Sequence, residues 1–446
     1  MSKIESKQLR NIALVGHGST GKTSLAEAFL FISGKNDRLG RVDDGSSTMD
    51  FEPEEQKRKI SVSSAVTFLE WDKNKINIVD TPGDQNFSFD TKNCLRVVDA
   101  AVVLVDAVGG VEYQTLKVWD YADEFKLPRV LYINRMDRER ANFDTALASI
   151  RKHFNAKISP VFLPIGSEAS FKGIVDLLEQ TAYIFTDFKS TPKKTEIPPD
   201  MQAEVDKYRG ILVEDIAEAD EELMDRYLND GELSLEDLKR GFRAAVIKGS
   251  LVPVACGSAT KGIGVSLLLD MIVNYLPSPV DRPDIRGSMA DQEATRLPDE
   301  SSPFCALVFK TIADPYAGRL TLFRVYSGTL KPDSSFYNSS RRISERFGHA
   351  FYLEGKNQKT AEYLIPGDIA AVAKLKETTT GDTLCLEKAP IILPRQAPPA
   401  PVMSFAVEAK NRGDEDKIIS SINRLIEEDP TLTLHRDNRT REMILS

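Results

Sequence analysis

Three short motifs carry residues of the kinds that bind nucleotides. The first, GHGSTGKTS at 16–24, fits the pattern G-x-x-x-x-G-K-[ST] without a mismatch. Glycines let the backbone curve round phosphates, with its N–H groups and the start of the next helix facing the anion. Lys22 would then reach the β and γ phosphates, and Thr23 would place its hydroxyl on Mg²⁺. The residues predicted to bind nucleotide here are Gly16, His17, Gly18, Ser19, Thr20, Gly21, Lys22, Thr23 and Ser24.

A glycine-rich turn that only caps a helix would have a similar pattern. The apolar run before the loop (Ile12 to Val15) and the helical pattern after it favour the phosphate site. This first motif does not distinguish ATP from GTP.

The second motif, DTPG at 80–83, ends the apolar strand pattern INIVD. Asp80 could hold Mg²⁺ through a water, and Gly83 leaves its N–H free to meet a γ-phosphate. The motif alone is weak, because many Asp–Gly turns resemble it. Its place about 60 residues after a phosphate loop makes the interpretation stronger.

The third motif, NRMD at 134–137, predicts which base is bound. Asp137 could accept hydrogen bonds from N1–H and the N2 amine of guanine, and adenine offers neither donor, so a buried unpaired carboxylate would reject it. Asn134 would tie the loops together, and Arg135 would lie against the base. NRMD alone is more often a polar turn. A further segment, Gly257, Ser258 and Ala259, ends a later strand, and the Ala259 N–H can address guanine O6. The four segments in order predict GTP or GDP with Mg²⁺.

The elements that must position these motifs alternate between strand and helix patterns over residues 10 to about 160. Such alternation predicts a parallel sheet with helices on both faces, and ligands bind at the carboxyl ends of its strands. Residues 166–250 are predicted to be an insertion, with two charged amphipathic helices around 201–228 and 235–248, because an apolar strand pattern returns at 251–259.

The rest of the chain no longer shows this alternation of strand and helix patterns. Residues 277–302 are rich in proline and charge and are predicted to be a linker, followed by a small β-barrel over about 303–394. After a second linker, a strand, a helix and a strand pair indicate the start of a small α/β domain, whose last strand is expected to lack a partner. We expect domains at 1–285, with the insertion at about 166–250, at 286–396 and at 400–446.

Composition limits the compartment and the partners. The chain has 446 residues, 41% hydrophobic and 28% charged, and a net charge of −9, which argues against general coating of nucleic acid. Its four cysteines show no zinc-binding spacing. Since no secretory signal or bilayer-spanning run is visible, we expect a cytoplasmic protein without a membrane partner.

The combined motifs resemble those of elongation factor G, a ribosomal translocation GTPase, and its nearest paralogues. The resemblance extends over essentially the whole chain, from GHGSTGKTSL through NIVDTPGDQNF and INRMD to VYSGTLKP and EDPTLTLHRDNRTREMILS. It implies a multidomain fold: an α/β P-loop GTPase domain with an inserted subdomain, a β-barrel, and the start of an α/β ferredoxin-like domain. The family has two further domains, so we expect a C-terminally truncated member.

The sequence departs from the family at three positions, two of which lie in segments expected near the γ-phosphate. The family's R-G-I-T is here Arg58, Lys59, Ile60 and Ser61, so Ser61 keeps the hydroxyl that would bind Mg²⁺, while Lys59 replaces a glycine. Arg135 stands where the family has lysine. The histidine that orients the attacking water in the family is here Asp84, which would follow Gly83 in the catalytic segment. We predict slow intrinsic hydrolysis, because a misplaced acceptor costs roughly 10²–10⁴-fold.

The resemblance implies a GTPase with GTP or GDP and Mg²⁺ as ligands. Thr23, Ser61 and Asp80 would hold the metal, and the partner would be the ribosome, through rRNA and ribosomal proteins, for a monomeric factor. Translocation, recycling and ribosome protection stay open as the ribosomal step. The alternative is a GTP-responsive ribosome-binding regulator with weak or no intrinsic hydrolysis.

Overall fold

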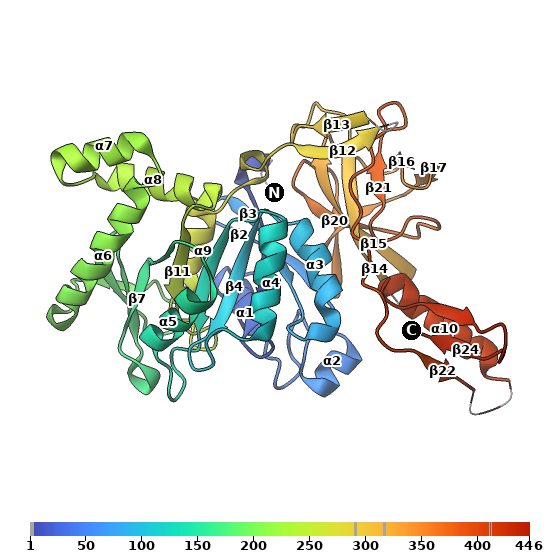
Figure 1. Cartoon of the computed structure of the whole chain (residues 1–446), viewed down its shortest axis with the longest axis horizontal. Helices are drawn as coiled ribbons and strands as arrows, with labels where there is room; N and C mark the ends of the chain where they lie inside the picture. Colours follow the sequence, from blue (N-terminus) through green and yellow to red (C-terminus); the bar gives the residue numbers. More distant parts are fainter. Residues whose placement is uncertain (1–3, 290–291, 315–317, 410, 412) are drawn as a thin grey trace. The chain divides into compact units, whose positions relative to one another are not determined.

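The computed structural model describes residues 4–289, 292–314, 318–409, 411 and 413–446. The chain divides into two compact units (Figure 1). The first comprises Met1–Arg282 together with Glu354–Asn357, and the second comprises Pro283–Leu353 and Gln358–Ser446. Each unit is described by itself.

The centre of the first unit is a mostly parallel sheet with the strand order β2-β3-β1-β4-β5-β11-β6. The strands span Leu9–Gly16 (β1), Ala65–Trp71 (β2), Asn74–Asp80 (β3), Ala100–Asp106 (β4), Arg129–Asn134 (β5), Ile158–Pro160 (β6) and Val252–Cys256 (β11). Every residue of β1, β4 and β5 is buried, as expected for strands covered on both faces.

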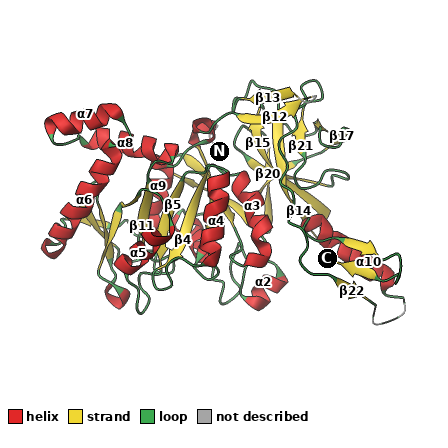
Figure 2. Cartoon of the chain, in the orientation of Figure 1, coloured by secondary structure: helices red, strands yellow, loops and turns green. Residues whose placement is uncertain are grey.

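Helices cover both faces of this sheet. They span Lys22–Ile32 (α1), Ser88–Arg96 (α3), Tyr113–Glu124 (α4), Phe143–His153 (α5) and Val265–Tyr275 (α9), with the shorter Pro53–Arg58 (α2) between α1 and β2. Helices α1 and α9 pack together, as do α3 and α4. Figure 1 shows α3, α4 and α5 on the near face of the sheet and Figure 2 shows the alternation of helix and strand that the sequence predicts.

One strand runs against the others, which the sequence analysis missed. Strand β2 pairs antiparallel with β3, from Trp71 opposite Asn74 to Ala65 opposite Asp80. The turn between them consists of Asp72 and Lys73, both with positive φ (42° and 60°). This is the backbone of a two-residue hairpin, for which Asn-Gly or Asp-Gly is the usual signal, so the Asp-Lys pair hid the turn.

The insertion consists of a small antiparallel sheet and three helices, where two helices were predicted. Its strands are Phe162–Ile165 (β7), Gly173–Asp176 (β8), Thr181–Ile184 (β9) and Lys193–Thr195 (β10), and its helices are Gln202–Ala217 (α6), Glu221–Asp230 (α7) and Leu235–Lys248 (α8). The predicted helix at 201–228 breaks because Asp220 caps α7, accepting a hydrogen bond from the Leu223 N–H at 3.1 Å.

A buried carboxyl group in the insertion makes its stability depend on pH. Oδ1 of Asp176 accepts hydrogen bonds from the N–H groups of Leu178 (2.8 Å) and Glu179 (3.0 Å), and burial raises the pKa of this carboxyl to about 6. That value lies above the pKa of about 3.9 expected for the unfolded chain. The cost of ionising this carboxyl is therefore absent below about pH 4, grows between about pH 4 and pH 6, and is complete above pH 6.

Asp176→Asn keeps the acceptor oxygen and removes the charge. We expect the free energy of unfolding to rise by up to about 3 kcal/mol at pH 8 and by about half as much at pH 5. Urea unfolding of the native and variant chains at both pH values measures the difference. An equal effect at the two pH values, or a loss of stability at pH 8, would show that the ionised carboxyl is not the source of the cost.

The second unit begins with a hairpin, although the sequence predicted a linker there. Strands Ile285–Met289 (β12) and Gln292–Arg296 (β13) pair antiparallel. An eight-stranded sheet follows, in the order β17-β16-β21-β14-β15-β20-β18-β19. Its strands are Cys305–Asp314 (β14), Gly318–Ser327 (β15), Ser335–Asn338 (β16), Ile343–Arg346 (β17), Ala350–Glu354 (β18), Asn357–Ala361 (β19), Ile369–Ala373 (β20) and Thr383–Cys385 (β21). Their inward side chains form an apolar core that includes Phe323, Phe336 and Leu384.

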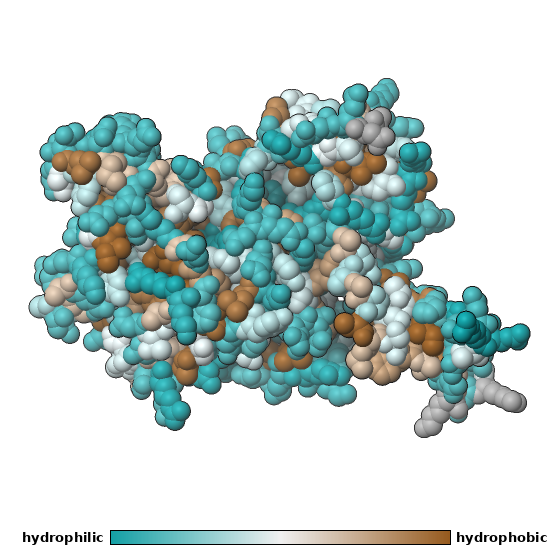
Figure 3. Space-filling view, in the orientation of Figure 1, coloured by the Kyte–Doolittle hydropathy of each residue, from teal (hydrophilic) through white to brown (hydrophobic). Residues whose placement is uncertain are grey.

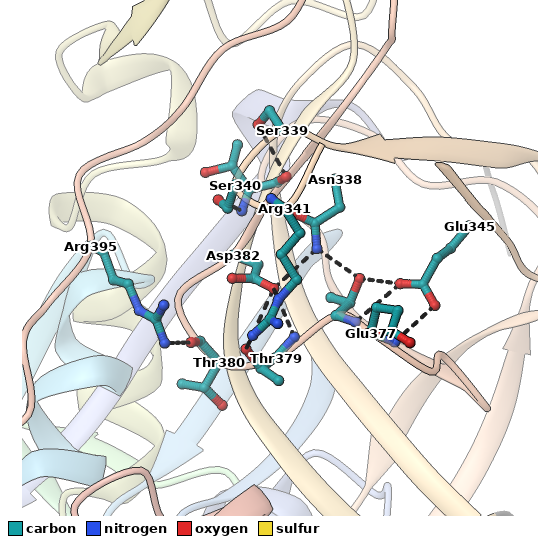
Figure 4. Close-up of polar contacts among 12 residues, drawn as sticks. Asn338, Ser339, Ser340, Arg341, Glu345, Glu377, Thr379, Thr380, Asp382 and Arg395 are labelled. Atoms are coloured by element: carbon teal, nitrogen blue, oxygen red, sulfur yellow. Dashed lines mark hydrogen bonds and ion pairs between the residues drawn. The ribbon is translucent and has the colours of Figure 1, made fainter. Parts of the chain in front are cut away.

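Two carboxylates hold the loop between β20 and β21 (Figure 4). Asp382 Oδ2 accepts hydrogen bonds from Arg341 Nε (2.7 Å), Asn338 Nδ2 (3.0 Å) and the Thr379 N–H (2.9 Å). On the other side, Glu345 on β17 accepts from three successive backbone N–H groups, those of residues 376–378. This network satisfies the backbone of the loop and fixes it to the edge of the sheet.

The last segment was predicted to end in an unpaired strand, and this prediction is wrong. It consists of Phe405–Val407 (β22), the helix Glu415–Glu428 (α10), Leu434–Arg436 (β23) and Met443–Leu445 (β24). Strand β24 lies in the middle and pairs antiparallel with both β22 and β23. The pairing with β22 spans almost forty residues of sequence, so no local pattern indicated it.

The outer surface of the described chain is largely polar in the view of Figure 3, with small separate apolar patches. No helix in the described part of the chain has the length and apolar composition needed to cross a bilayer.

Candidate nucleotide-binding site

The predicted motifs meet around one pocket at the carboxyl ends of the central strands. Its volume is about 680 Å³. Predicted site residues that line it are His17, Gly18, Ser19, Gly21, Lys22, Thr23, Ser24, Ser61, Gly83, Asp84, Arg135 and Ala259. Residues that line it without having been predicted include Asp50, Tyr113, Gln114 and Thr260.

The loop after β1 has the backbone that its glycines predict. Gly16 has φ +143°, and an added Cβ there would collide with the Leu104 carbonyl group of the neighbouring strand. Gly21, the residue just before α1, has φ +91°, and an added Cβ there would meet the Asn134 amide. The N-terminus of an eleven-residue helix therefore faces the pocket, as an anion site requires.

Lys22 is a buried cation at the floor of this pocket. Its Nζ donates hydrogen bonds to the carbonyl oxygens of Gly16 (3.1 Å) and His17 (2.8 Å). Burial lowers its pKa to about 8, and the nearby Asp80 and Asp50 partly oppose this effect. An ammonium that has lost most of its water in this way gains strongly from an anionic ligand.

Oxygen atoms from three predicted residues and one unpredicted residue gather beside Lys22. Thr23 Oγ1 lies 3.2 Å from Ser61 Oγ. The Thr23 hydroxyl also interacts with Asp80, and the Ser61 hydroxyl interacts with Asp50. Thr23, Ser61 and Asp80, which the sequence assigned to the metal, therefore lie together.

The two carboxylates of this cluster are unusually placed. Asp80 is 2% exposed and Asp50 is 4% exposed, and one oxygen of each has no hydrogen-bond partner among the described residues. Burial raises the pKa of both, that of Asp80 to about 8, with the charge of Asp50 contributing to the latter. A divalent cation would relieve both effects, because it replaces the missing contacts and favours the ionised carboxylates.

Sequence reasoning missed Asp50 because nothing near it in the chain indicates a site. It comes into the cluster through the segment before α2, which Glu27 of α1 holds in place. Glu27 Oε1 accepts hydrogen bonds from Ser47 Oγ (2.8 Å) and the Met49 N–H (3.1 Å). The partners in these contacts are about twenty residues apart in sequence. The one feature of the sequence that could have indicated them is a glutamate within an otherwise apolar helix.

The segment after β3 lies directly against the phosphate loop. An added Cβ at Gly83 would lie 2.7 Å from both N and Cα of Gly18 and would also meet Lys22 Nζ, so only glycine fits. The next residue, Asp84, is exposed and uses its Oδ1 to accept a hydrogen bond from the Asn86 N–H (2.9 Å) at the start of a short 3₁₀ turn, Gln85–Phe87. Its side chain therefore turns back onto its own loop.

The segment after β5 connects the two ends of the pocket. Asn134 Nδ2 donates to the Thr20 carbonyl (2.8 Å), and Asn134 Oδ1 accepts from the Ala259 N–H (3.0 Å). Arg135, with φ +65°, lines the pocket and pairs with Asp106 at 3.3 Å. The asparagine thus joins the phosphate loop to the loop after β11, as the sequence analysis proposed for it.

Several predicted residues are not among those that line the pocket. The pocket-lining residues do not include Gly16, Thr20, Asp80, Asn134, Asp137, Gly257 or Ser258. Asp137 is half-buried just after Met136, whose N–H donates to the Gly257 carbonyl (3.1 Å). Its role in base recognition therefore stays a prediction.

The segment around α2 contains Lys59, which stands where the family has a glycine. Lys59 ends α2 in the left-handed conformation, with φ +57°. A side chain in this conformation costs roughly 1–2 kcal/mol, and glycine avoids this cost. The backbone at Lys59 is therefore strained, because the family's glycine is replaced here by a residue with a side chain.

Comparison with known families and structures agrees with this geometry. Residues 7–278 match the Elongation factor Tu GTP binding domain, residues 303–387 match Elongation factor G domain 2, and residues 398–446 match Elongation Factor G, domain III.

A solved structure has the same fold over almost the whole chain. It is the crystal structure of ttk003000868 from Thermus thermophilus, which is 31% identical and superposes with a TM-score of 0.87. The match covers 98% of this chain and 63% of that protein, so this chain spans less than two thirds of the length of its relative. From the order of the three matched domains and this structural likeness, the chain belongs to the elongation factor G family of translational GTPases.

Proposed function

We propose that this chain binds GTP with Mg²⁺, associates with the ribosome, and couples binding and hydrolysis of GTP to a conformational change in translocation or a related ribosomal step. The observation that carries the proposal is the single pocket in which Lys22, the Thr23–Ser61 pair and Ala259 meet. The phosphates would lie on the phosphate loop and the base between Arg135 and Ala259.

Mg²⁺ fits the residues beside the phosphate loop. Two hydroxyls and the unpartnered oxygens of Asp50 and Asp80 form an all-oxygen donor set, which this ion prefers. Thr23 and Ser61 would hold the ion, with Asp80 behind them. When bound, Mg²⁺ would neutralise charge on the β and γ phosphates.

The protein's own groups supply the remaining functions. Lys22 and the backbone N–H groups of the phosphate loop would hold the β and γ phosphates, and Gly83, packed closely on Gly18 and Lys22, would offer its N–H to the γ-phosphate. Asp137 would read the N1–H and N2 donors of guanine. Asn134 keeps the phosphate end and the base end of the pocket at a fixed separation.

The alternative is a GTP-responsive, ribosome-binding regulator with weak or no intrinsic hydrolysis. Asp84 favours this alternative, because its carboxylate adds negative charge near the γ-phosphate and already bonds to its own loop. The two functions share the ligand and the partner and differ in turnover.

Sedimentation with ribosomes tests the proposal. The chain should pellet with ribosomes in the presence of a non-hydrolysable GTP analogue and less so with GDP. Lys22→Ala, which cannot hold the triphosphate, is the matched control and should lose the nucleotide dependence. Ribosome-stimulated GTP hydrolysis would favour the first function, binding without stimulation would favour the regulator, and equal pelleting with every nucleotide would contradict both.

A further inference from the structure

Gln114 lies at the pocket without any role assigned by the motifs. It is in the first turn of α4, is 1% exposed, and lines the pocket together with Lys22, Gly83 and Asp84. Its side-chain oxygen Oε1 is buried and has no hydrogen-bond partner among the described residues. A buried amide oxygen without a partner is costly, so a ligand or a water that donates to it is expected.

Hydrogen bonds on the nitrogen side of the Gln114 amide fix its orientation. Gln114 Nε2 donates to Ser88 Oγ at 3.1 Å, and Ser88 Oγ in turn donates to the Gln85 carbonyl at 2.6 Å. This chain joins α4 to the loop that contains Asp84. Because the amide nitrogen is held by Ser88, the oxygen is the amide atom that remains available to a donor from a ligand or water at this wall of the pocket.

Asp84 is less suited to act on a water near the γ-phosphate. Its Oδ1 is bonded to the Asn86 N–H, and its charge opposes that of the phosphates. A neutral amide oxygen can accept a hydrogen bond from water without adding charge, which is how a glutamine can orient the nucleophile in phosphoryl transfer.

We propose that Gln114 Oε1 is the acceptor that orients the attacking water for GTP hydrolysis in this chain. In that step the water oxygen forms a bond to the γ-phosphorus, and the bond from this phosphorus to the β–γ bridging oxygen breaks. GDP leaves with that electron pair, and the proton of the water ends on the phosphate products. The assignment rests on the proposed GTP-hydrolysing function and names the residue that acts in place of position 84.

His17 is the competing candidate. It also lines the pocket, and its Nδ1 is buried without a partner among the described residues. Its Nε2, however, contacts Glu112 at 3.2 Å and its carbonyl accepts from Lys22, so the residue is built into the phosphate loop. We expect His17 to affect binding of the nucleotide more than its hydrolysis.

Single-turnover hydrolysis with protein in excess over GTP tests the assignment. Gln114→Met has a similar volume and no acceptor, and we expect its rate to fall roughly tenfold to hundredfold while its GTP dissociation constant stays within about twofold. Gln114→Asn keeps a neutral amide with an acceptor oxygen on a shorter side chain, so its rate should lie between those of the methionine variant and the native chain. Asp120→Ala, exposed on the same helix, is the matched control and should behave as the native chain.

The possible outcomes distinguish a failure of the role of Gln114 from a failure of the proposed GTP hydrolysis. A native rate in Gln114→Met, a rate in Gln114→Asn below that of the methionine variant, or a comparable loss in His17→Ala at saturating GTP would each overturn the role of Gln114. If the native chain binds GTP but never hydrolyses it, both this role and the hydrolytic function fall. Thermal melting of each variant shows whether a lost rate reflects a lost fold.

Discussion

Lys22→Ala should reduce the affinity for GTP and GDP by roughly 10²–10⁴-fold. The side chain is the buried cation at the phosphate end of the pocket, and each hydrogen bond to a charged group contributes about 1.5–3 kcal/mol. Two such bonds to phosphate oxygens correspond to about 3–6 kcal/mol, and each 1.4 kcal/mol is about a tenfold change in affinity. Titration with a fluorescent guanine nucleotide measures the loss.

The same substitution should leave the fold intact. Burial already lowers the pKa of Lys22, which means that its charge is held at a cost in the protein. The variant loses this cost together with the two hydrogen bonds to Gly16 and His17, so we expect it to melt close to the temperature of the native chain, and weak binding cannot then be attributed to unfolding. Lys172→Ala, which removes an exposed lysine of the same domain, is the control and should bind normally. Near-native affinity in Lys22→Ala would remove the basis for the phosphate site.

Asp84→His should raise the single-turnover rate of GTP hydrolysis by roughly ten- to a thousandfold. The substitution removes a negative charge beside the γ-phosphate and supplies an imidazole where the resemblance to the family places the water-orienting histidine. It also removes the acceptor of the Asn86 N–H, which is on an exposed turn and therefore costs little. The rate is measured by rapid quenching with protein in excess.

Asp84→Asn separates the two causes. It keeps the acceptor for Asn86 and removes the charge, so it should recover part of the rate if the charge is what slows hydrolysis. If both variants hydrolyse GTP no faster than the native chain, position 84 does not limit the rate. That result would leave Gln114 as the main water-orienting group.

The motifs predicted the pocket well because each lies at a strand end. Lys22, Gly83 and Ala259 lie in the segments after β1, β3 and β11, and the parallel order of these strands brings the three segments to one edge of the sheet. Ser61 reaches the same edge on the segment before the antiparallel strand β2. An aspartate or glycine at such an end can therefore be assigned from local sequence alone.

The missed features depend on contacts between distant segments. Asp50 and Gln114 come to the pocket through Glu27 and Ser88, and neither partner is close in sequence. The central position of β24 likewise follows from pairing with β22 across α10. Local patterns indicate that such a strand or helix exists. They do not show where it lies in the fold, because contacts with distant segments determine that position.

Some misses came from unusual local chemistry. The hairpin of β2 and β3 uses Asp72 and Lys73 where turn residues such as Asn-Gly are typical, and the linker after α9 contains the paired strands β12 and β13. In both places the backbone adopts a regular structure that its residue types do not favour.

The central claim is that Asp137 makes the pocket selective for guanine. Calorimetric titration of the native chain with GTP and with ATP, both with Mg²⁺, tests it most directly, with Asp137→Ala as the variant that should lose the difference. We expect GTP to bind at least about a hundredfold more tightly than ATP, because adenine leaves the carboxylate unpaired. Equal affinities for the two nucleotides would contradict the claim.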